Sequence, residues 1–398
     1  MEEKLFNKGF ISITVINFIV YLVYYLLMVI IAVIASDNLN ATPSQAGFAS
    51  GIYIIGTLLA RLLIGKKLEI YGRKEVLRFG ALFYLVTTLA YFYMPSLTIL
   101  YLVRFFNGFA YGTISSATNA SVTSYIPDAK HGTGINYYGL STSLAAAIGP
   151  FIGMILLQLT NFYTIISFSA ILIFLTTIAC FLIEIKNVQL TDEHRHLLNQ
   201  WRLNSFIEPK VIFIAFIAFL IGLAYSSVLA FLSSYAEVIH LVTASSFFFV
   251  VYATVITLTR PLSGKIFDAY GENHVMYPSY LFLTLGLFLL SITTQSWMLL
   301  LSGAFIGLGY GTFMSNGQAI CLKKVPKARI SIALSTYFIG LDLGLGVGPY
   351  LLGVLRGFVS FAGVYFVCAF IPIICAILYA LFYQKQPASS KKTIATLR

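Results

Sequence analysis

Asp342 is the one acidic residue that lies deep inside a long apolar segment of this chain. It comes about 12 residues after the predicted start of a helix over 330–356, or roughly 18 Å at 1.5 Å per residue. If that helix crosses a bilayer, an isolated carboxylate at this depth costs several kcal/mol unless it is paired, hydrated or protonated. A carboxyl group that gains and loses a proton there is suited to proton coupling. The alternatives are contact with a substrate and a packing role beside Gly340 and Gly344.

Arg104 is the corresponding deep cation, inside the apolar segment 98–125. A guanidinium group remains charged in proteins, so in an apolar setting it needs a partner. The first half of the chain offers no acidic residue at a similar depth. One use of Arg104 would therefore be to hold an anionic part of a substrate.

A basic, glycine-containing stretch occurs twice, as RLLIGKKLEIYGRK at Arg61–Lys74 and, 199 residues later, as RPLSGKIFDAYG at Arg260–Gly271. Glycine lets another helix pack closely. An acidic side chain can accept hydrogen bonds from amides at a helix N-terminus. The main residues shared at this offset are Gly65 with Gly264, Glu69 with Asp268, and Gly72 with Gly271.

We expect Arg73 to pair with Glu69 or with Glu184, which follows the sixth apolar segment, and this cluster to hold two parts of the protein together as a gate. The second copy has Glu272 in the position of Arg73, so it is expected to hold less strongly. Charges that only set the topology are the alternative. Arg61 and Arg260 are expected to extend to the membrane surface as structural or gating residues.

Composition indicates an all-α integral membrane protein. The chain has 398 residues, of which 59% are apolar and 10% are charged, and its mean hydropathy is +0.88. Soluble domains carry roughly 25% charged residues, so lipid must cover much of this surface. Twelve transmembrane helices are predicted, at roughly 9–35, 45–65, 77–94, 98–125, 133–158, 163–185, 209–236, 244–265, 275–294, 297–322, 330–356 and 361–384.

Lys and Arg are distributed asymmetrically among the connections. They gather in alternate loops and at both ends of the chain, whereas the intervening loops hold none except Arg356. By the positive-inside rule, both termini are cytoplasmic. This bias also accounts for the net charge of +11, so we do not expect nucleic-acid binding.

The 199-residue offset extends beyond the basic stretch. Gly108, Tyr111 and Gly112 correspond to Gly307, Tyr310 and Gly311, and Gly149-Pro150 corresponds to Gly348-Pro349. Two parallel repeats predict two pseudo-symmetric six-helix bundles about an axis along the membrane normal, with a site between them. The expected domains are residues 1–188 and 209–398, joined by a cytoplasmic linker over 189–208.

These motifs resemble the major facilitator superfamily. GKKLEIYGRK is similar to the family's loop GxxxDxxGR[RK], with Glu69 in place of Asp. LVRFFNGFAYG is similar to the helix 4 signature RxxxG, and GLSTSLAAAIGPFIG is similar to the helix 5 signature GPxxG of drug/proton antiporters. The resemblance implies alternating access and proton coupling through Arg104, although the acid that many relatives carry in helix 1 or 4 is absent. GINYYGLSTSL also resembles exporters of metabolites and opine-type metallophores.

Further candidates line the predicted path. Gly149-Pro150 removes a backbone hydrogen bond and permits a kink that would help to close one side. A cavity-facing stripe is predicted on the first helix, with core packing as the alternative, and one polar pair related by the 199-residue offset is predicted to face it. The stripe comprises Asn17, Tyr21, Tyr24 and Met28, and the pair is Asn119 and Gln318.

The sequence therefore predicts a transporter and not an enzyme. It has no HExxH, GxSxG or GxxxxGK[ST] motif, and we expect no metal and no cofactor, with the proton gradient as energy source. The preferred function is proton-coupled efflux of a small organic molecule by a monomer in a bacterial-type cell membrane. Proton-coupled uptake of a nutrient and a non-transporting scaffold or sensor are the alternatives.

Overall fold

The computed structural model describes residues 5–41, 43–127, 130–185, 187–188, 190 and 206–383. Most of the predicted linker, 189–208, lies outside these residues. Every described element is helical. The long helices are α1 (Lys8–Leu39), α2 (Pro43–Tyr71), α3 (Arg73–Leu89), α4 (Leu97–Val122), α5 (His131–Leu159), α6 (Phe162–Leu182), α8 (Ile212–Val238), α9 (Val242–Tyr270), α10 (Asn273–Ser291), α11 (Ser296–Ile306), α12 (Thr312–Lys324), α13 (Ile330–Arg356) and α14 (Phe361–Leu378).

Eleven helical segments among the described residues are long and apolar enough to cross a membrane. One of them, Ser296–Lys324, contains α11, α12 and the π-helical turn η6 (Gly307–Gly311) between them. The helix α2, which we also expected to span, is not in this set; it is 29 residues long and carries Arg61 and Lys66.

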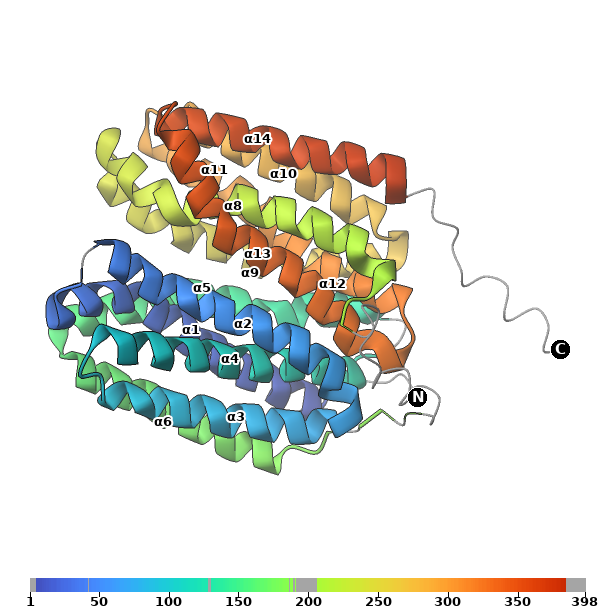
Figure 1. Cartoon of the computed structure of the whole chain (residues 1–398). Helices are drawn as coiled ribbons and strands as arrows, with labels where there is room; N and C mark the ends of the chain where they lie inside the picture. The colour runs from blue at the N-terminus through green and yellow to red at the C-terminus, as the bar shows by residue number, and fades with distance from the viewer. Residues whose placement is uncertain are drawn as a thin grey trace.

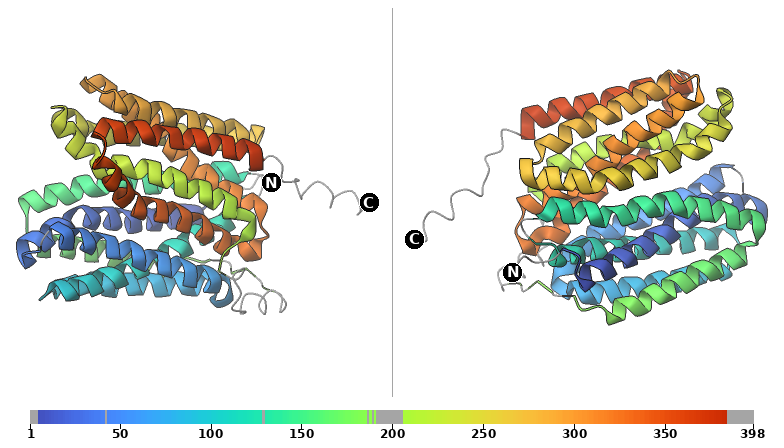
Figure 2. Two further views of the ribbon diagram at one scale, coloured as in Figure 1. Left: turned by 45° about the horizontal axis from the view of Figure 1, so that its top comes forward. Right: turned by 180° about the vertical axis from the view of Figure 1, so that it is seen from behind.

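The helices form two halves (Figure 1). Helices α1 to α6 pack together, as do α8 to α14, and the two groups meet mainly where α2 packs on α13 and α5 packs on α9. Helices α3 and α6 lie on the outer face of one half, and α10 and α14 lie on the outer face of the other (Figures 1 and 2).

The start of α1 and the end of α14 lie on the same side of the molecule, which we call the terminal side (Figure 1). The ribbons of the two halves diverge toward the opposite, far side in all views (Figure 2). The hydrogen bonds that join the halves involve residues near the terminal ends of α2, α5, α9, α12 and α13, and one deeper pair described below.

Close approach of backbones explains two of the repeated glycines. A Cβ atom added to Gly108 would lie 2.1 Å from the carbonyl oxygen of Tyr53, and one added to Gly307 would lie 3.0 Å from that of Tyr252. All four positions are related by the 199-residue offset. The same packing therefore occurs in both halves.

Helix α2 is longer than the predicted segment 45–65. The polar residues after Gly65 were interpreted as a loop, but the helix continues to Tyr71. It stops at Gly72, whose φ of 93° is unfavourable for any residue with a side chain. Helix α9 likewise continues to Tyr270 before Gly271, whose φ is 90°.

Candidate substrate and proton site

An ion pair between a buried arginine and a partly buried aspartate joins the two halves in the interior. The Nε atom of Arg61 on α2 lies 2.7 Å from the Oδ2 atom of Asp342 on α13. The Arg61 side chain is 2% exposed and the Asp342 side chain is 19% exposed. The guanidinium of Arg61 also lies over the ring of Phe338, with its central carbon 4.6 Å from the ring centroid. Asp342 thus has a charged partner, on the other half.

The expectation that Arg61 extends to the membrane surface is wrong, because its side chain is buried. The error came from ending the helix at Gly65. Since α2 ends at Tyr71, Arg61 lies about 15 Å from that end at 1.5 Å per residue. Arg260 on α9 is in the same situation and is also buried.

Arg104 on α4 is fully buried and has only neutral partners among the described residues. Its guanidinium donates to the carbonyl oxygen of Ala49 at 2.9 Å, to the hydroxyl of Tyr91 at 3.2 Å and to the sulfur of Met28 at 2.9 Å. It also lies 4.3 Å from the ring centroid of Tyr53, a favourable cation–π distance. These contacts leave its charge without a carboxylate.

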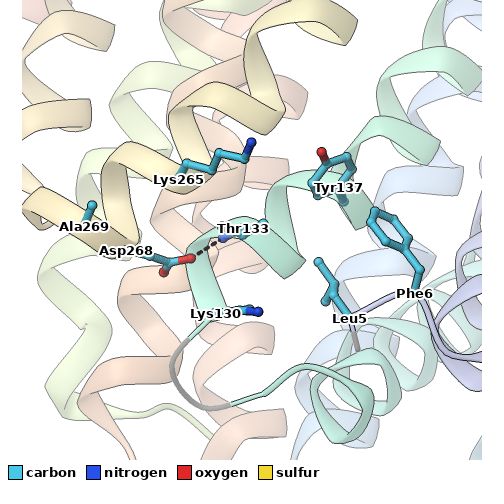
Figure 3. A pocket seen from close by; sticks show the side chains of 8 residues that line it. All are labelled: Leu5, Phe6, Lys130, Thr133, Tyr137, Lys265, Asp268 and Ala269. Atoms are coloured by element: carbon cyan, nitrogen blue, oxygen red, sulfur yellow. Dashed lines mark hydrogen bonds between the residues drawn. The ribbon is translucent and has the colours of Figure 1, made fainter. Parts of the chain in front are cut away.

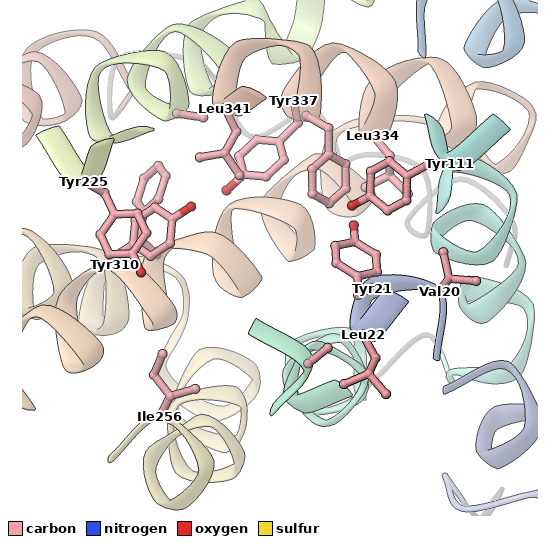
Figure 4. Packing of buried hydrophobic residues seen from close by; sticks show 14 of the residues in the cluster. Val20, Tyr21, Leu22, Tyr111, Tyr225, Ile256, Tyr310, Leu334, Tyr337 and Leu341 are labelled. Carbon is pink, nitrogen blue, oxygen red and sulfur yellow. The ribbon is translucent and has the colours of Figure 1, made fainter. Parts of the chain in front are cut away.

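Two similar groups of stacked tyrosines lie in the interior, one in each half. In the first half, the ring of Tyr24 stacks on Tyr111 at 4.5 Å and on Tyr53 at 5.3 Å between centroids. In the second half, Tyr225 stacks on Tyr310 at 3.8 Å and on Tyr252 at 5.9 Å. Figure 4 shows Tyr21 beside Tyr111 on one side and Tyr225 beside Tyr310 on the other.

The sequence interpretation missed Tyr53 and Tyr252 as central residues. They are related by the same offset of 199 residues as Tyr111 and Tyr310, and this was the available signal. The π-helical turn at Gly307–Gly311 contains Tyr310. Such turns are frequent at functional sites, but nothing in the local residue pattern predicts one here.

The other residues predicted to face a cavity have different surroundings in the structure. Asn17 is fully buried, donates to Ser141 at 2.8 Å, and accepts from Tyr138 at 2.7 Å, so it ties α1 to α5. Asn119 donates to the carbonyl oxygen of Ser115 within its own helix. Gln318 is buried, and its amide oxygen has no hydrogen-bond partner among the described residues.

On the terminal side, Arg73 pairs with Glu69 at 2.7 Å, with both side chains almost completely buried. Arg73 also donates to the carbonyl oxygen of Ala120 at 2.7 Å. Glu69 accepts a 2.5 Å hydrogen bond from Ser331 on α13, which connects the halves. Of the two partners expected for Arg73, the structure shows Glu69; the residue Glu184 is exposed, and its carbonyl oxygen accepts from Tyr125.

The pair of Glu69 and Arg73 gives a stability prediction. Arg73→Gln leaves the Glu69 carboxylate buried without its partner, so the free energy of unfolding should fall by about 3–5 kcal/mol. The double variant Glu69→Gln/Arg73→Gln removes both charges and should recover most of this loss. Denaturant unfolding of the purified protein in detergent checks this; a double variant no more stable than Arg73→Gln would contradict it.

The second copy of the basic stretch holds the halves together differently. Asp268 on α9 accepts hydrogen bonds from the backbone amides of Gly132 at 2.7 Å and Thr133 at 2.8 Å, at the start of α5. Figure 3 shows the hydrogen bond between Asp268 and Thr133 beside a pocket of about 660 Å³ that Lys130 and Lys265 help to line. Among the described residues Asp268 accepts two hydrogen bonds across the interface and Glu69 accepts one, while the first copy adds the ion pair of Arg61 with Asp342. That the second copy holds less strongly stays a prediction.

Gly149 and Pro150 lie within α5, which is a continuous helix from His131 to Leu159. A Cβ atom at Gly149 would lie 2.8 Å from Cβ of Tyr25 on α1. Gly149 therefore lets α1 approach α5 beside the tyrosines, in addition to any bending that Pro150 permits.

Two helical halves around a shared charged interior are the architecture of an alternating-access carrier. A family model described as the Major Facilitator Superfamily matches residues 13–294 and 242–397. The chain belongs to this superfamily, whose members are transporters and not enzymes.

Individual relatives agree with this. The chain is 22% identical over 370 residues to an uncharacterised MFS-type transporter of Methanocaldococcus jannaschii, covering 89% of this chain and 93% of the relative. It is 24% identical over 324 residues to the multi-drug resistance efflux pump PmrA of Streptococcus pneumoniae, covering 79% and 80%. The solved structure of the proton:xylose symporter XylE matches with a TM-score of 0.75 and 13% identity over 94% of this chain and 96% of that one. At that identity the structural match shows the fold alone.

Proposed function

We propose that this chain is a secondary active transporter that exports a small organic molecule from the cytoplasm in exchange for protons. The observation that carries the proposal is the ion pair of the buried Arg61 with the partly buried Asp342, which joins the two halves. A charged carboxyl group at this depth is costly unless it is paired or hydrated, and Arg61 supplies the pairing. The efflux direction is supported by the GPxxG pattern at Gly149–Gly153 and by similarity to a multi-drug efflux pump.

Protonation of Asp342 is the proposed trigger for conformational change. A proton on this carboxyl group neutralises it and removes the charge-assisted bond to Arg61. The contact between α2 and α13 is then weaker, and opening on the terminal side costs less. A change of a few kcal/mol in one contact is enough to shift a two-state equilibrium strongly.

The terminal side is proposed to be cytoplasmic, because Lys and Arg concentrate in the connections there. With twelve spanning helices, both termini then lie inside a bacterial-type cell membrane. The contacts of Glu69 and Asp268 would form the inner gate of the state seen here. This state would open outward, where a proton can reach Asp342.

An imposed pH gradient tests the proposal. Proteoliposomes are loaded with acidic buffer, the membrane potential is clamped to zero, and three probes of different charge are offered: ethidium, chloramphenicol and 2-naphthalenesulfonate. An antiporter accumulates at least one probe when the lumen is acidic, because outward proton flow drives inward probe flow. Accumulation only with an alkaline lumen would instead favour proton symport, and movement indifferent to the gradient in both directions would refute proton coupling.

A further inference from the structure

Arg260 is the one interior arginine whose charge lacks a compensating partner in the described structure. Its side chain is 1% exposed. Neither Nε nor Nη1 has a hydrogen-bond partner, and it takes part in no ion pair with a described residue. By contrast, Arg61 has Asp342, and Arg104 has a carbonyl, a hydroxyl, a sulfur and an aromatic ring. A buried unpaired guanidinium is costly, so its retention requires a reason.

The internal repeat shows that the side chains which contact Arg61 have no counterparts around Arg260. Arg61 and Arg260 are equivalent at the 199-residue offset, and Gly149-Pro150 and Gly348-Pro349 keep the same offset on the helices that face them. In the first site, Arg61 contacts both a ring and a carboxylate on α13. The residues at the equivalent positions on α5 are Gly139 in place of Phe338 and Ser143 in place of Asp342.

With Gly139 and Ser143 at these positions, the guanidinium of Arg260 faces small side chains on α5. A Cβ atom at Gly139 would lie 2.3 Å from Nη1 of Arg260 and 2.6 Å from Oγ of Ser315. Ser143 follows one helical turn later on the same face of α5. The hydroxyl of Ser315, beside the guanidinium, also has no hydrogen-bond partner among the described residues.

The surroundings are aromatic and come from both halves. Gly139 on α5 of the first half lies directly against the guanidinium of Arg260, and Tyr252, Tyr310, Tyr25 and Tyr337 lie within electrostatic range of it. Tyr25 belongs to the first half, and the other three belong to the second. A ligand bound at Arg260 would therefore lie between the halves, at the place where an alternating-access carrier holds its cargo.

We propose that Arg260 binds the acidic group of the transported molecule, and hence that the substrates are small organic anions. This rests on the proposed function as a carrier. A carboxylate or sulfonate oxygen would replace the carboxylate that Asp342 supplies in the other half, and a guanidinium binds such groups through paired hydrogen bonds. Ser315 would donate to the same group, and the tyrosine rings would contact an apolar or aromatic body.

Three planar probes of the same shape test the charge preference. Benzoate, benzamide and benzamidine are added separately to the detergent-purified protein, and binding is followed by thermal stabilisation over a concentration series. Benzoate should stabilise the protein at concentrations at least about 10-fold lower than its neutral and cationic analogues, as expected for a gain of about 1.4 kcal/mol from the charged contact. Equal effects of the three probes would overturn the proposal.

Ser143 offers a matched pair of variants. Ser143→Asp restores the carboxylate that the repeat predicts, so it should pair with Arg260, raise the melting temperature of the ligand-free protein, and weaken benzoate binding at least about 10-fold. Ser143→Asn has almost the same size without the charge and should retain benzoate binding. If both variants bind benzoate like the unmodified protein, the proposal fails.

Arg260→Gln should lose the preference for benzoate, whereas Arg104→Gln should keep it, since Arg104 already has its own partners. The reverse pattern would move the anion site to Arg104 and overturn the assignment. If Arg260→Gln does not fold, the variants Ser143→Asp and Ser143→Asn still test the proposal. These measurements are made at equilibrium without a gradient, so they can succeed or fail independently of proton coupling.

Discussion

Asp342→Asn is expected to abolish accumulation driven by a pH gradient. With a gradient of two pH units and one proton per substrate at zero membrane potential, a coupled carrier can reach a concentration ratio of about 100, since each unit is worth about 1.4 kcal/mol. The amide is neutral at both ends of the gradient, so the ratio should fall to about 1. The measurement is the steady-state probe ratio in proteoliposomes.

The same variant should still exchange probe for probe across the bilayer. The asparagine resembles the protonated carboxyl group, so the halves can still rearrange and the site remains. Glu75→Gln, at an exposed position on α3, is the control and should keep the full ratio. Normal accumulation by Asp342→Asn would remove this residue from the coupling mechanism, and loss of exchange together with accumulation would indicate damage to the fold.

Gly65→Ala is expected to open the terminal side. A Cβ atom at Gly65 would lie 2.3 Å from Oγ and 2.6 Å from Cβ of Ser335 on α13, so the two halves cannot keep their present contact. Overpacking of this kind costs about 1–3 kcal/mol, which would change the ratio of closed to open molecules roughly 5- to 150-fold. Spin labels at Tyr71 and Tyr270 report the separation, because these residues are 62% and 69% exposed at the terminal ends of α2 and α9.

A second substitution provides the control for this prediction. Ser335→Gly removes the hydroxymethyl group, and the next atom near the added methyl is then the carbonyl oxygen of Ser331 at 3.7 Å, an ordinary contact distance. Gly65→Ala/Ser335→Gly should therefore return to the short label distance. Failure of the double variant to recover would mean that Gly65 acts through something other than this contact.

Much of the fold could be predicted from the sequence because the repeat is explicit. The offset of 199 residues relates Gly108 to Gly307 and Gly65 to Gly264, and in the structure these glycines occupy close contacts between helices. Close contacts of this kind require glycine, so they can be recognised in the sequence. The depth of Asp342 also followed from counting along its helix, because α13 begins at Ile330, as predicted.

The partner of Asp342 could not be predicted, because pairing across the halves depends on where α2 ends. The polar residues Lys66, Lys67 and Glu69 suggested a loop, whereas in the structure they belong to α2, which packs on α13 and α4. Ending α2 six residues too early was enough to place Arg61 at the membrane surface instead of in the interior. Helix ends are the least reliable part of such an interpretation.

The role of Asn17 shows a different limit. Its spacing with Tyr21 and Tyr24 correctly places the three residues on one face of α1, but one face of a helix can contact both a cavity and a neighbouring helix. In the structure Asn17 is bonded to Tyr138 and Ser141 on α5, whereas Tyr24 stacks on Tyr111. Only the packing of α1 against α5 distinguishes the two roles.

The most direct test of the central claim is a pH titration of the distance between spin labels at positions 71 and 270. If the charged pair of Arg61 and Asp342 holds the terminal side closed, lowering the pH should increase the fraction of molecules with a long distance. Asp342→Asn should show that long distance at every pH, while Glu75→Gln titrates like the unmodified protein. An unchanged titration in Asp342→Asn would contradict the account.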